Sequence, residues 1–129
     1  MDCVFCKIIN NEIPSYKIYE TDKVFAFLDI NPVNPGHTLV IPKKHVDYIF
    51  DIPDKEYSNL FLEAKKISKV LKKITKAKRI GIIVEGFAVH HTHIHLVPLY
   101  IGGELCLSLG KPATEKELKE MQAKILKEL

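Results

Sequence analysis

Residues 89–98, VHHTHIHLVP, constrain the fold more than any other stretch of this chain, because they hold four of its six histidines. Histidines alternate there with other side chains, in the order His91, Thr92, His93, Ile94, His95 and Leu96. A period of two is typical of a β-strand whose two faces differ. We therefore expect three imidazoles in a row along one face, with Ile94 and Leu96 in the core. Three titratable rings fill a core poorly, so the row predicts a functional site.

Four further segments have the apolar or alternating character of strands, namely residues 16–20, 24–29, 37–42 and 80–85. The first two are separated by a short polar turn and predict a hairpin. The third is almost continuously apolar, which predicts a central strand. Residues 4–10 are a short apolar piece that predicts one or two helical turns.

Two helices are also predicted, the first from apolar residues that recur with the period of an α-helix and the second from a capping pattern. Apolar residues recur at intervals of three and four across residues 57–74, which predicts an amphipathic helix that starts near Pro53, with Asp51 or Asp54 as its N-cap. Thr114 and Glu117 match the capping-box pattern and predict a closing helix over about residues 114–128. Hairpin-connected strands with two main helices favour an α+β fold with a mainly antiparallel sheet.

Composition narrows the classes of function. The 129 residues suit one domain, residues 1–129, and contents of 47% hydrophobic and 27% charged residues are those of a soluble globular protein. The net charge of +3 comes largely from lysines of the longer predicted helix, which we interpret as a solvated face and not as a nucleic-acid site. No segment is apolar for long enough to span a bilayer, and the N-terminus lacks the basic start of a signal peptide. We therefore expect a cytoplasmic protein with no membrane or nucleic-acid partner.

The chemistry-bearing residues leave alternatives open. Histidines at i and i+2 on a strand can bind zinc, or a neutral imidazole nitrogen can attack an electrophile while the other nitrogen is held by a hydrogen bond. Cys3 and Cys6 form a C-x-x-C that is compatible with redox chemistry, with two free thiols, or with zinc if two more ligands are supplied. Cys106 stands apart from both.

The motif from His91 to Val97, HTHIHLV, fits the pattern His-x-His-x-His followed by two hydrophobic residues, and here the chain resembles the histidine triad (HIT) superfamily. The resemblance extends to other segments in the family's order: residues 5–14 (FCKIINNEIP), 26–32 (AFLDINP) and 36–45 (GHTLVIPKKH). It implies the HIT-like fold, with five strands and two main helices. Residues 100–129 lie outside these motifs.

The resemblance implies a hydrolase or transferase that acts at the α-phosphate of nucleotides. His93 would attack phosphorus and form a nucleotidyl-imidazole, which water or another acceptor then resolves. The other catalytic histidines would be His95 and His37, which would lie beside the phosphate, and His91 of the triad. Asp29 would bind the ribose hydroxyls. The base would lie between the apolar side chains of Phe5, Ile8, Leu28 and Ile30. The expected ligand is a purine nucleotide or nucleotide conjugate, with no metal at the phosphate.

The resemblance also implies a structural zinc ion. In the bacterial-type branch with an N-terminal C-x-x-C, the zinc ligands correspond to Cys3, Cys6, His45 and His91, a sound set for a closed tetrahedral site. Family members of this kind are homodimers, so we expect one here.

The chain departs from phosphoramidase members just before the triad. The link is only residues 86–89, and Ala88 stands near the position of a serine implicated in protonating the leaving group. Rival functions are therefore a dinucleoside-polyphosphate hydrolase or nucleotidyltransferase, a nucleotide-binding regulatory protein with weak turnover, and a zinc hydrolase that uses the three histidines as ligands.

Two further expectations concern structure. His90 should face opposite the triad and be either partly exposed or satisfied by hydrogen bonds. Residues 100–111 either border the pocket or reach across a dimer.

Overall fold

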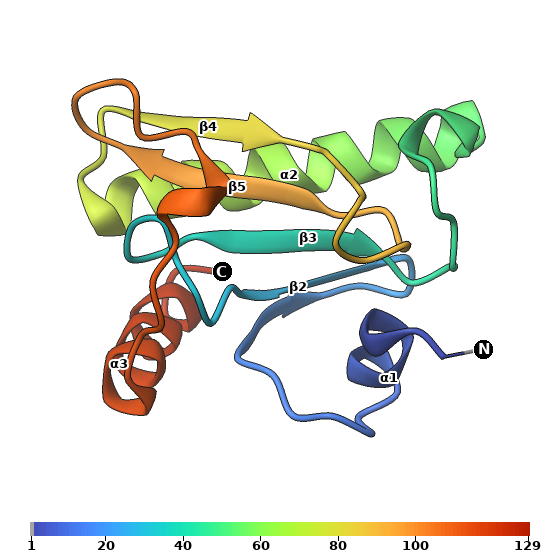
Figure 1. Cartoon of the computed structure of the whole chain (residues 1–129), viewed down its shortest axis with the longest axis horizontal. Helices are drawn as coiled ribbons and strands as arrows, with labels where there is room; N and C mark the ends of the chain where they lie inside the picture. Colours follow the sequence, from blue (N-terminus) through green and yellow to red (C-terminus); the bar gives the residue numbers. More distant parts are fainter. Residues whose placement is uncertain (1) are drawn as a thin grey trace.

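The structure is a computed structural model and describes residues 2–129. Figure 1 shows a twisted sheet with one long helix behind it and two shorter helices drawn below it in this view. In chain order the elements are α1 (Val4–Ile9), β1 (Lys17–Glu20), β2 (Val24–Leu28), β3 (Thr38–Pro42), the short 3₁₀ helix η1 (Ile49–Asp51), α2 (Asp54–Thr75), β4 (Arg79–Ile83), β5 (Ile94–Leu99), the 3₁₀ helix η2 (Leu107–Leu109) and α3 (Glu115–Leu126).

The strands form one sheet in the order β1-β2-β3-β5-β4, and every neighbouring pair is antiparallel. The predicted hairpin is β1 and β2, and the predicted central strand is β3, which pairs with β2 on one side and β5 on the other. The predicted α+β class with a mainly antiparallel five-stranded sheet is therefore confirmed.

Alternation along the strands creates two different cores. On one face, Ala26, Val40 and Leu96 pack against buried residues of α2 and α3, such as Leu71 and Ile125. On the other face, a smaller cluster joins α1 to the sheet through Cys3, Phe5, Ile8, Phe25, Phe27, Leu39 and Ile41. Since His95 lies opposite Leu39 in the ladder, its imidazole belongs to the α1 face, as the alternation predicts.

The triad strand is shorter than expected, because β5 begins only at Ile94. Its ladder with β3 runs from Val40–Ile94 to Thr38–Leu96. Before this point, the backbone N–H of Thr92 bonds to the carbonyl of Val46, in the connection that follows β3, instead of continuing the ladder. The histidine row therefore lies across the end of a strand: His95 is within it, while His91 and His93 precede it.

The helices match the expected periods but not every expected cap. Thr114 and Glu117 form the predicted capping box at the start of α3. The prediction that Asp51 or Asp54 caps α2 is wrong, because Pro53 occupies the N-cap without a side-chain bond, Asp51 ends η1, and Asp54 is already the first helical residue. The lysines of α2 are exposed, as expected for a solvated face. Among residues 2–129, no helix combines the length and the apolar character that crossing a membrane would require.

Candidate active site

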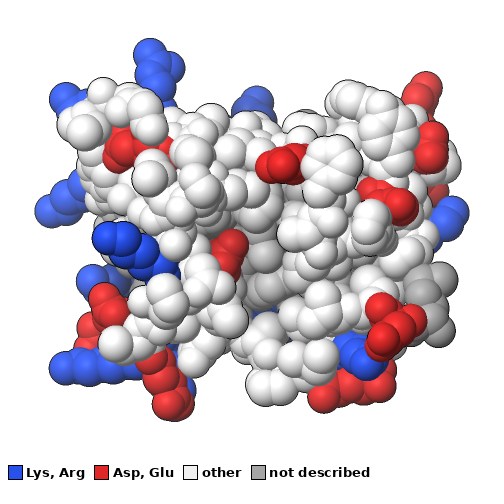
Figure 2. Space-filling view, in the orientation of Figure 1, with Lys and Arg blue, Asp and Glu red and all other residues white. Residues whose placement is uncertain are grey.

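A pocket of about 790 Å³ opens on the α1 face, a volume typical of small-molecule sites. Its walls come from α1, the end of β2, the turn before the triad and the strap, a name we give to residues 100–113. The lining contains all five residues assigned to the nucleoside and two of the triad: Phe5, Ile8, Leu28, Asp29, Ile30, His93 and His95. Figure 2 shows this face, where lysine and arginine lie mainly toward the margins and acidic side chains stand around the hollowed centre.

The His93 imidazole has a defined tautomer. Its Nδ1 atom lies 2.7 Å from the carbonyl oxygen of His91, and a carbonyl can only accept, so Nδ1 carries the proton and donates it. In the neutral ring the lone pair is then on the Nε2 atom, and the side chain borders the pocket. The Phe5 ring stands edge-on to the imidazole, with 5.1 Å between centroids. This arrangement is the one that a nucleophilic imidazole needs.

A chain of hydrogen bonds also sets the tautomers of His37 and His95. The backbone N–H of Val33 donates to Nδ1 of His37 over 3.1 Å, so the proton of His37 is on Nε2. That Nε2 atom lies 2.9 Å from Nδ1 of His95, which must accept. His95 therefore carries its proton on Nε2. Burial lowers the pKa of His37 to about 4 and that of His95 to about 4, so both are neutral donors at neutral pH.

Gly36 forms the turn directly before His37. It has a φ of +95°, and a Cβ there would lie 2.8 Å from the Thr75 side chain. Only glycine meets both requirements without strain, so the sharp turn that aims His37 at His95 depends on this residue.

Asp29 follows directly after β2 and lines the pocket. One carboxylate oxygen accepts the backbone N–H of Asn31 over 2.8 Å, and the other lies 3.6 Å from Nε2 of His37. Burial raises the pKa of Asp29, while the Asn31 N–H opposes that shift. The carboxylate is thus held in a fixed direction at the edge of the pocket.

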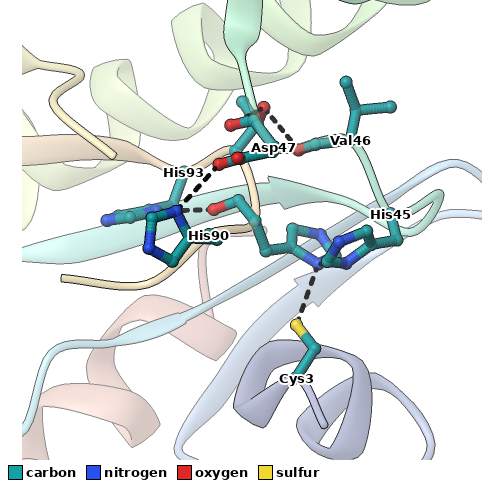
Figure 3. Close-up of polar contacts among 8 residues, drawn as sticks. Cys3, His45, Val46, Asp47, His90 and His93 are labelled. Atoms are coloured by element: carbon teal, nitrogen blue, oxygen red, sulfur yellow. Dashed lines mark hydrogen bonds and ion pairs between the residues drawn. The ribbon is translucent and has the colours of Figure 1, made fainter. Parts of the chain in front are cut away.

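His91 turns away from the pocket to a second group of residues. Its Nδ1 atom lies 3.4 Å from Sγ of Cys3, 3.6 Å from Sγ of Cys6 and 3.2 Å from Nδ1 of His45. The Sγ atom of Cys6 lies 3.4 Å from Nδ1 of His45. Figure 3 shows the Cys3 side chain pointing from α1 toward the imidazoles. The structure thus brings together the four predicted zinc ligands.

The distances of this group fit a tetrahedral zinc ion. With standard bond lengths, the edges of such a site are about 3.6 Å between sulfur and nitrogen and about 3.3 Å between two nitrogens. The observed separations of 3.4, 3.6 and 3.2 Å lie close to these values. In addition, Nε2 of His91 lies 2.8 Å from the carbonyl of Pro42, so it donates there and leaves the lone pair of Nδ1 facing the cysteines.

The three triad histidines do not converge on one point. Within residues 2–129, two groups of side chains have donor atoms close enough for an ion, and His91 belongs to one while His95 belongs to the other, with Asp29 and His37. The second group is a poor metal site, because Val33 N–H holds the His37 proton on the nitrogen that would have to bind metal. This geometry argues against the zinc-hydrolase alternative.

The strap supplies pocket residues that sequence reasoning left undecided. Backbone bonds tie Lys111 to Pro32 and Ala113 to Ile30, and Gly110 packs so closely against the Asn31 carbonyl that a Cβ would collide with it. As a result, Leu107 and Ser108 line the pocket. Of the two possibilities for this segment, the structure shows the first, a border of the pocket. No local sequence pattern marks these two residues, because only the packing of the strap against the loop after β2 places them.

The turn before the triad forms the remaining wall. Gly86, Phe87 and Ala88 all line the pocket, and the Phe87 side chain is 80% exposed. His90 is exposed, as expected, and its Nδ1 atom lies 3.4 Å from the Asp47 carboxylate (Figure 3). Phe87 and Ala88 are exposed, so the chain presents an open rim at this wall of the pocket.

Comparison with known families matches residues 10–101 to the HIT domain. The adenosine 5'-monophosphoramidase HNT1 of Saccharomyces cerevisiae is 40% identical, over 98% of this chain and 80% of the relative. The adenylylsulfatase HINT3 of Arabidopsis thaliana is 37% identical, over 75% of this chain and 52% of the relative.

Solved structures of HIT-type proteins have the same fold as this chain. A Hit-like protein from Bartonella henselae, described as involved in cell-cycle regulation, superposes with a TM-score of 0.87 at 36% identity and covers 99% of this chain and 97% of its own. A zinc-bound histidine triad family protein from Mycobacterium smegmatis superposes with a TM-score of 0.81 at 28% identity, covering 98% and 95%.

Proposed function

This chain belongs to the histidine triad (HIT) family, and from that premise we propose that it hydrolyses nucleoside monophosphate derivatives, phosphoramidates among them, through a covalent nucleotidyl-histidine intermediate. One observation carries the proposal. The bond from His93 Nδ1–H to the His91 carbonyl leaves the other imidazole nitrogen free beside the pocket. The relatives named as a phosphoramidase and an adenylylsulfatase support a hydrolase that acts on nucleotides.

In the first step, the Nε2 lone pair of His93 forms a bond to the α-phosphorus. The bond from phosphorus to the leaving group breaks, and its electron pair departs with that group. The imidazole gains positive charge, which the His91 carbonyl stabilises through the Nδ1–H bond. His95 donates its Nε2–H to a phosphoryl oxygen as charge develops there. Ala88 has no proton to donate, so the leaving group takes its proton from water at the open rim.

In the second step, water attacks the phosphorus of the intermediate and breaks its bond to His93. The electron pair returns to Nε2, the water loses a proton to solvent, and the nucleoside monophosphate is released. The nucleoside lies between the apolar walls of Phe5, Ile8, Leu28 and Ile30, with its ribose hydroxyls on Asp29. Since those walls offer a large apolar slot, purines are the expected bases.

The charge of the pocket favours substrates with few negative charges. Its described lining contains two acidic residues, Asp29 and Glu85, and no lysine or arginine. The donors at the phosphate are neutral imidazoles. A phosphate chain with several charges would therefore lack counterions, which favours a single charged α-phosphate over a dinucleoside polyphosphate.

Zinc held by Cys3, Cys6, His45 and His91 would have a structural role. It would tie the N-terminus and the loop after β3 to the triad, in keeping with the zinc-bound relative. Both thiols would be bound as thiolates, which fits a reducing, cytoplasmic location. The phosphate site itself needs no metal in this mechanism.

A homodimer is part of the proposal. β4 is an edge strand, and Ile82 on it is 50% exposed. An edge strand with an exposed apolar side chain invites pairing with another chain. Sedimentation equilibrium of the protein, with Ile82→Lys as the variant expected to dissociate, tests this point.

The function is tested by trapping. Mass spectrometry of protein quenched without acid, after exposure to adenosine 5'-phosphoramidate, should show an adenylyl adduct on His93. His93→Ala should lose the adduct and the turnover, while His90→Ala, which removes an exposed histidine of the same segment, should keep both. Binding of adenosine monophosphate with no adduct and no turnover would instead indicate a regulatory nucleotide-binding protein.

A further inference from the structure

Thr92 is a buried polar residue that the proposed mechanism does not use. It separates His91 from His93 and is 1% exposed. Its neighbours at the equivalent alternate positions, Ile94 and Leu96, are apolar and pack in the core. A hydroxyl at such a position costs free energy unless it is hydrogen-bonded, so its partners indicate what it does.

Those partners lie in the connection after β3. The Thr92 hydroxyl lies 2.8 Å from the carbonyl of Val46 and 3.2 Å from that of Asp47, and its backbone N–H donates to Val46 over 2.7 Å. Among the described residues, these are the hydrogen bonds that join the backbone of Val46 and Asp47 to the triad segment. Figure 3 shows Val46 and Asp47 beside the chain that carries His90 and His93.

These hydrogen bonds of Thr92 lie between the Cys₂His₂ group and the pocket that His93 borders. On one side, Val46 directly follows His45, whose Nδ1 atom lies 3.2 Å from that of His91. On the other side, Thr92 joins the His91 carbonyl to His93, which donates to that carbonyl over 2.7 Å. A shift of the Thr92 peptide would therefore displace two groups. One is His45 of the Cys₂His₂ group, and the other is the His91 carbonyl, which fixes the His93 tautomer.

We propose that Thr92 is a positioning residue, and that its hydroxyl couples the loop carrying His45 to the nucleophile. Removing the hydroxyl weakens metal binding by the Cys₂His₂ group and loosens the hydrogen bond that orients the His93 imidazole. The catalytic part of this inference rests on the proposed function, whereas the metal and tautomer parts do not.

The test compares Thr92→Val, which keeps the shape, with Thr92→Ser, which keeps the hydroxyl. Thr75→Val is the matched control, because the Thr75 hydroxyl also donates to a backbone carbonyl, that of Leu71, but within α2. Three quantities are measured on each full-length protein: the Co²⁺ dissociation constant from thiolate charge-transfer absorption, the His93 tautomer from long-range ¹H–¹⁵N correlation at fixed pH, and kcat and KM with adenosine 5'-phosphoramidate.

We expect Thr92→Val to raise the Co²⁺ dissociation constant about tenfold, the usual effect of losing a group that orients a ligand. The Nδ1–H signal of His93 should weaken toward a mixture of tautomers, and kcat should fall with KM unchanged. Thr92→Ser should restore all three quantities, and Thr75→Val should leave them as in the wild type.

The inference is overturned if Thr92→Val binds Co²⁺ and shows the His93 tautomer as the wild type does, or if Thr92→Ser behaves like Thr92→Val. Failure of the proposed function has a different signature. In that case the wild-type protein shows no turnover, while the metal and tautomer measurements still respond to Thr92→Val.

Discussion

The Nε2 atom of His37 lies 2.9 Å from Nδ1 of His95, and the two rings form a buried pair. Because Val33 fixes the proton of His37, His95 presents a donor on its other nitrogen. The residues come from neighbouring antiparallel strands, or from their ends, and are 58 positions apart in the chain. The pairing of β3 with β5 thus creates a neutral donor, which in the proposed mechanism faces a phosphoryl oxygen.

Stability should fall as the solution is acidified below about pH 6.5. His37 and His95 have pKa values of about 4 when folded, against an ordinary value of 6.5, because burial disfavours their charged forms. Between pH 6.5 and about pH 4, the unfolded chain binds protons that the folded protein does not. Each of the two histidines therefore lowers the free energy of unfolding by up to about 1.4 kcal/mol for every pH unit of acidification. The raised pKa of Asp29 opposes this loss only at the acid end.

Urea unfolding at a series of pH values measures the effect. His37→Gln keeps a side-chain N–H donor but does not titrate, so its stability should fall less steeply than that of the wild type. His90→Ala, at an exposed position, should follow the wild-type curve. A wild-type stability that is flat between pH 6.5 and 4.5 would contradict the prediction.

Asp29→Asn should weaken nucleotide binding and remove the preference for ribose. Losing charge-assisted hydrogen bonds costs about 1.5 kcal/mol or more, which is about tenfold in affinity. Calorimetric titration with adenosine monophosphate and its 2',3'-dideoxy analogue measures both effects. Glu85→Gln changes the other carboxylate of the lining and serves as the control. Equal discrimination against the dideoxy analogue in Asp29→Asn and the wild type would show that Asp29 does not contact the ribose.

Purified protein from a zinc-replete preparation should contain about one zinc ion per chain, as expected for a closed four-ligand site. Cys3→Ser should lose the metal and unfold at a lower temperature, because the proposed ion would tie α1 to the triad. Cys106→Ser is the matched control, since Cys106 is exposed and lies outside the Cys₂His₂ group. Elemental analysis and thermal unfolding give the answer, and less than about half an equivalent in the wild type would refute the site.

Leu71→Ala should lower the free energy of unfolding by about 2 to 5 kcal/mol, as deletion of a buried leucine does. Leu71 is 0% exposed in the core between α2 and the sheet. Leu62→Ala, on the same helix but 63% exposed, should change stability by less than about 0.5 kcal/mol. Chemical denaturation of both variants makes the comparison, and similar losses would mean that α2 is not packed through the Leu71 face.

Much of the fold was predictable because periodicity reports which side of an element is buried. The alternation through Ile94, His95 and Leu96 correctly placed Ile94 and Leu96 in the core and His95 on the opposite face, beside the pocket. The spacing in α2 correctly separated its apolar face from its lysines. The cap of α2 was mispredicted because an aspartate near a helix start is only a candidate, and Pro53 occupies the N-cap position.

By itself, the sequence determined which face of each strand is apolar and which is polar, the family, and the residue types available for chemistry. The alternation alone did not separate the roles of His91, His93 and His95, which look alike in a period of two. The separate roles expected of them came from the family resemblance. The contacts that support this division join distant segments: His91 faces cysteines 88 and 85 positions away, and His95 meets His37 across two strands. The tautomers depend on carbonyls and N–H groups of other loops, and Leu107 and Ser108 reach the pocket only through the packing of the strap. Such long-range proximity has no local signature, so only the tertiary structure could decide it.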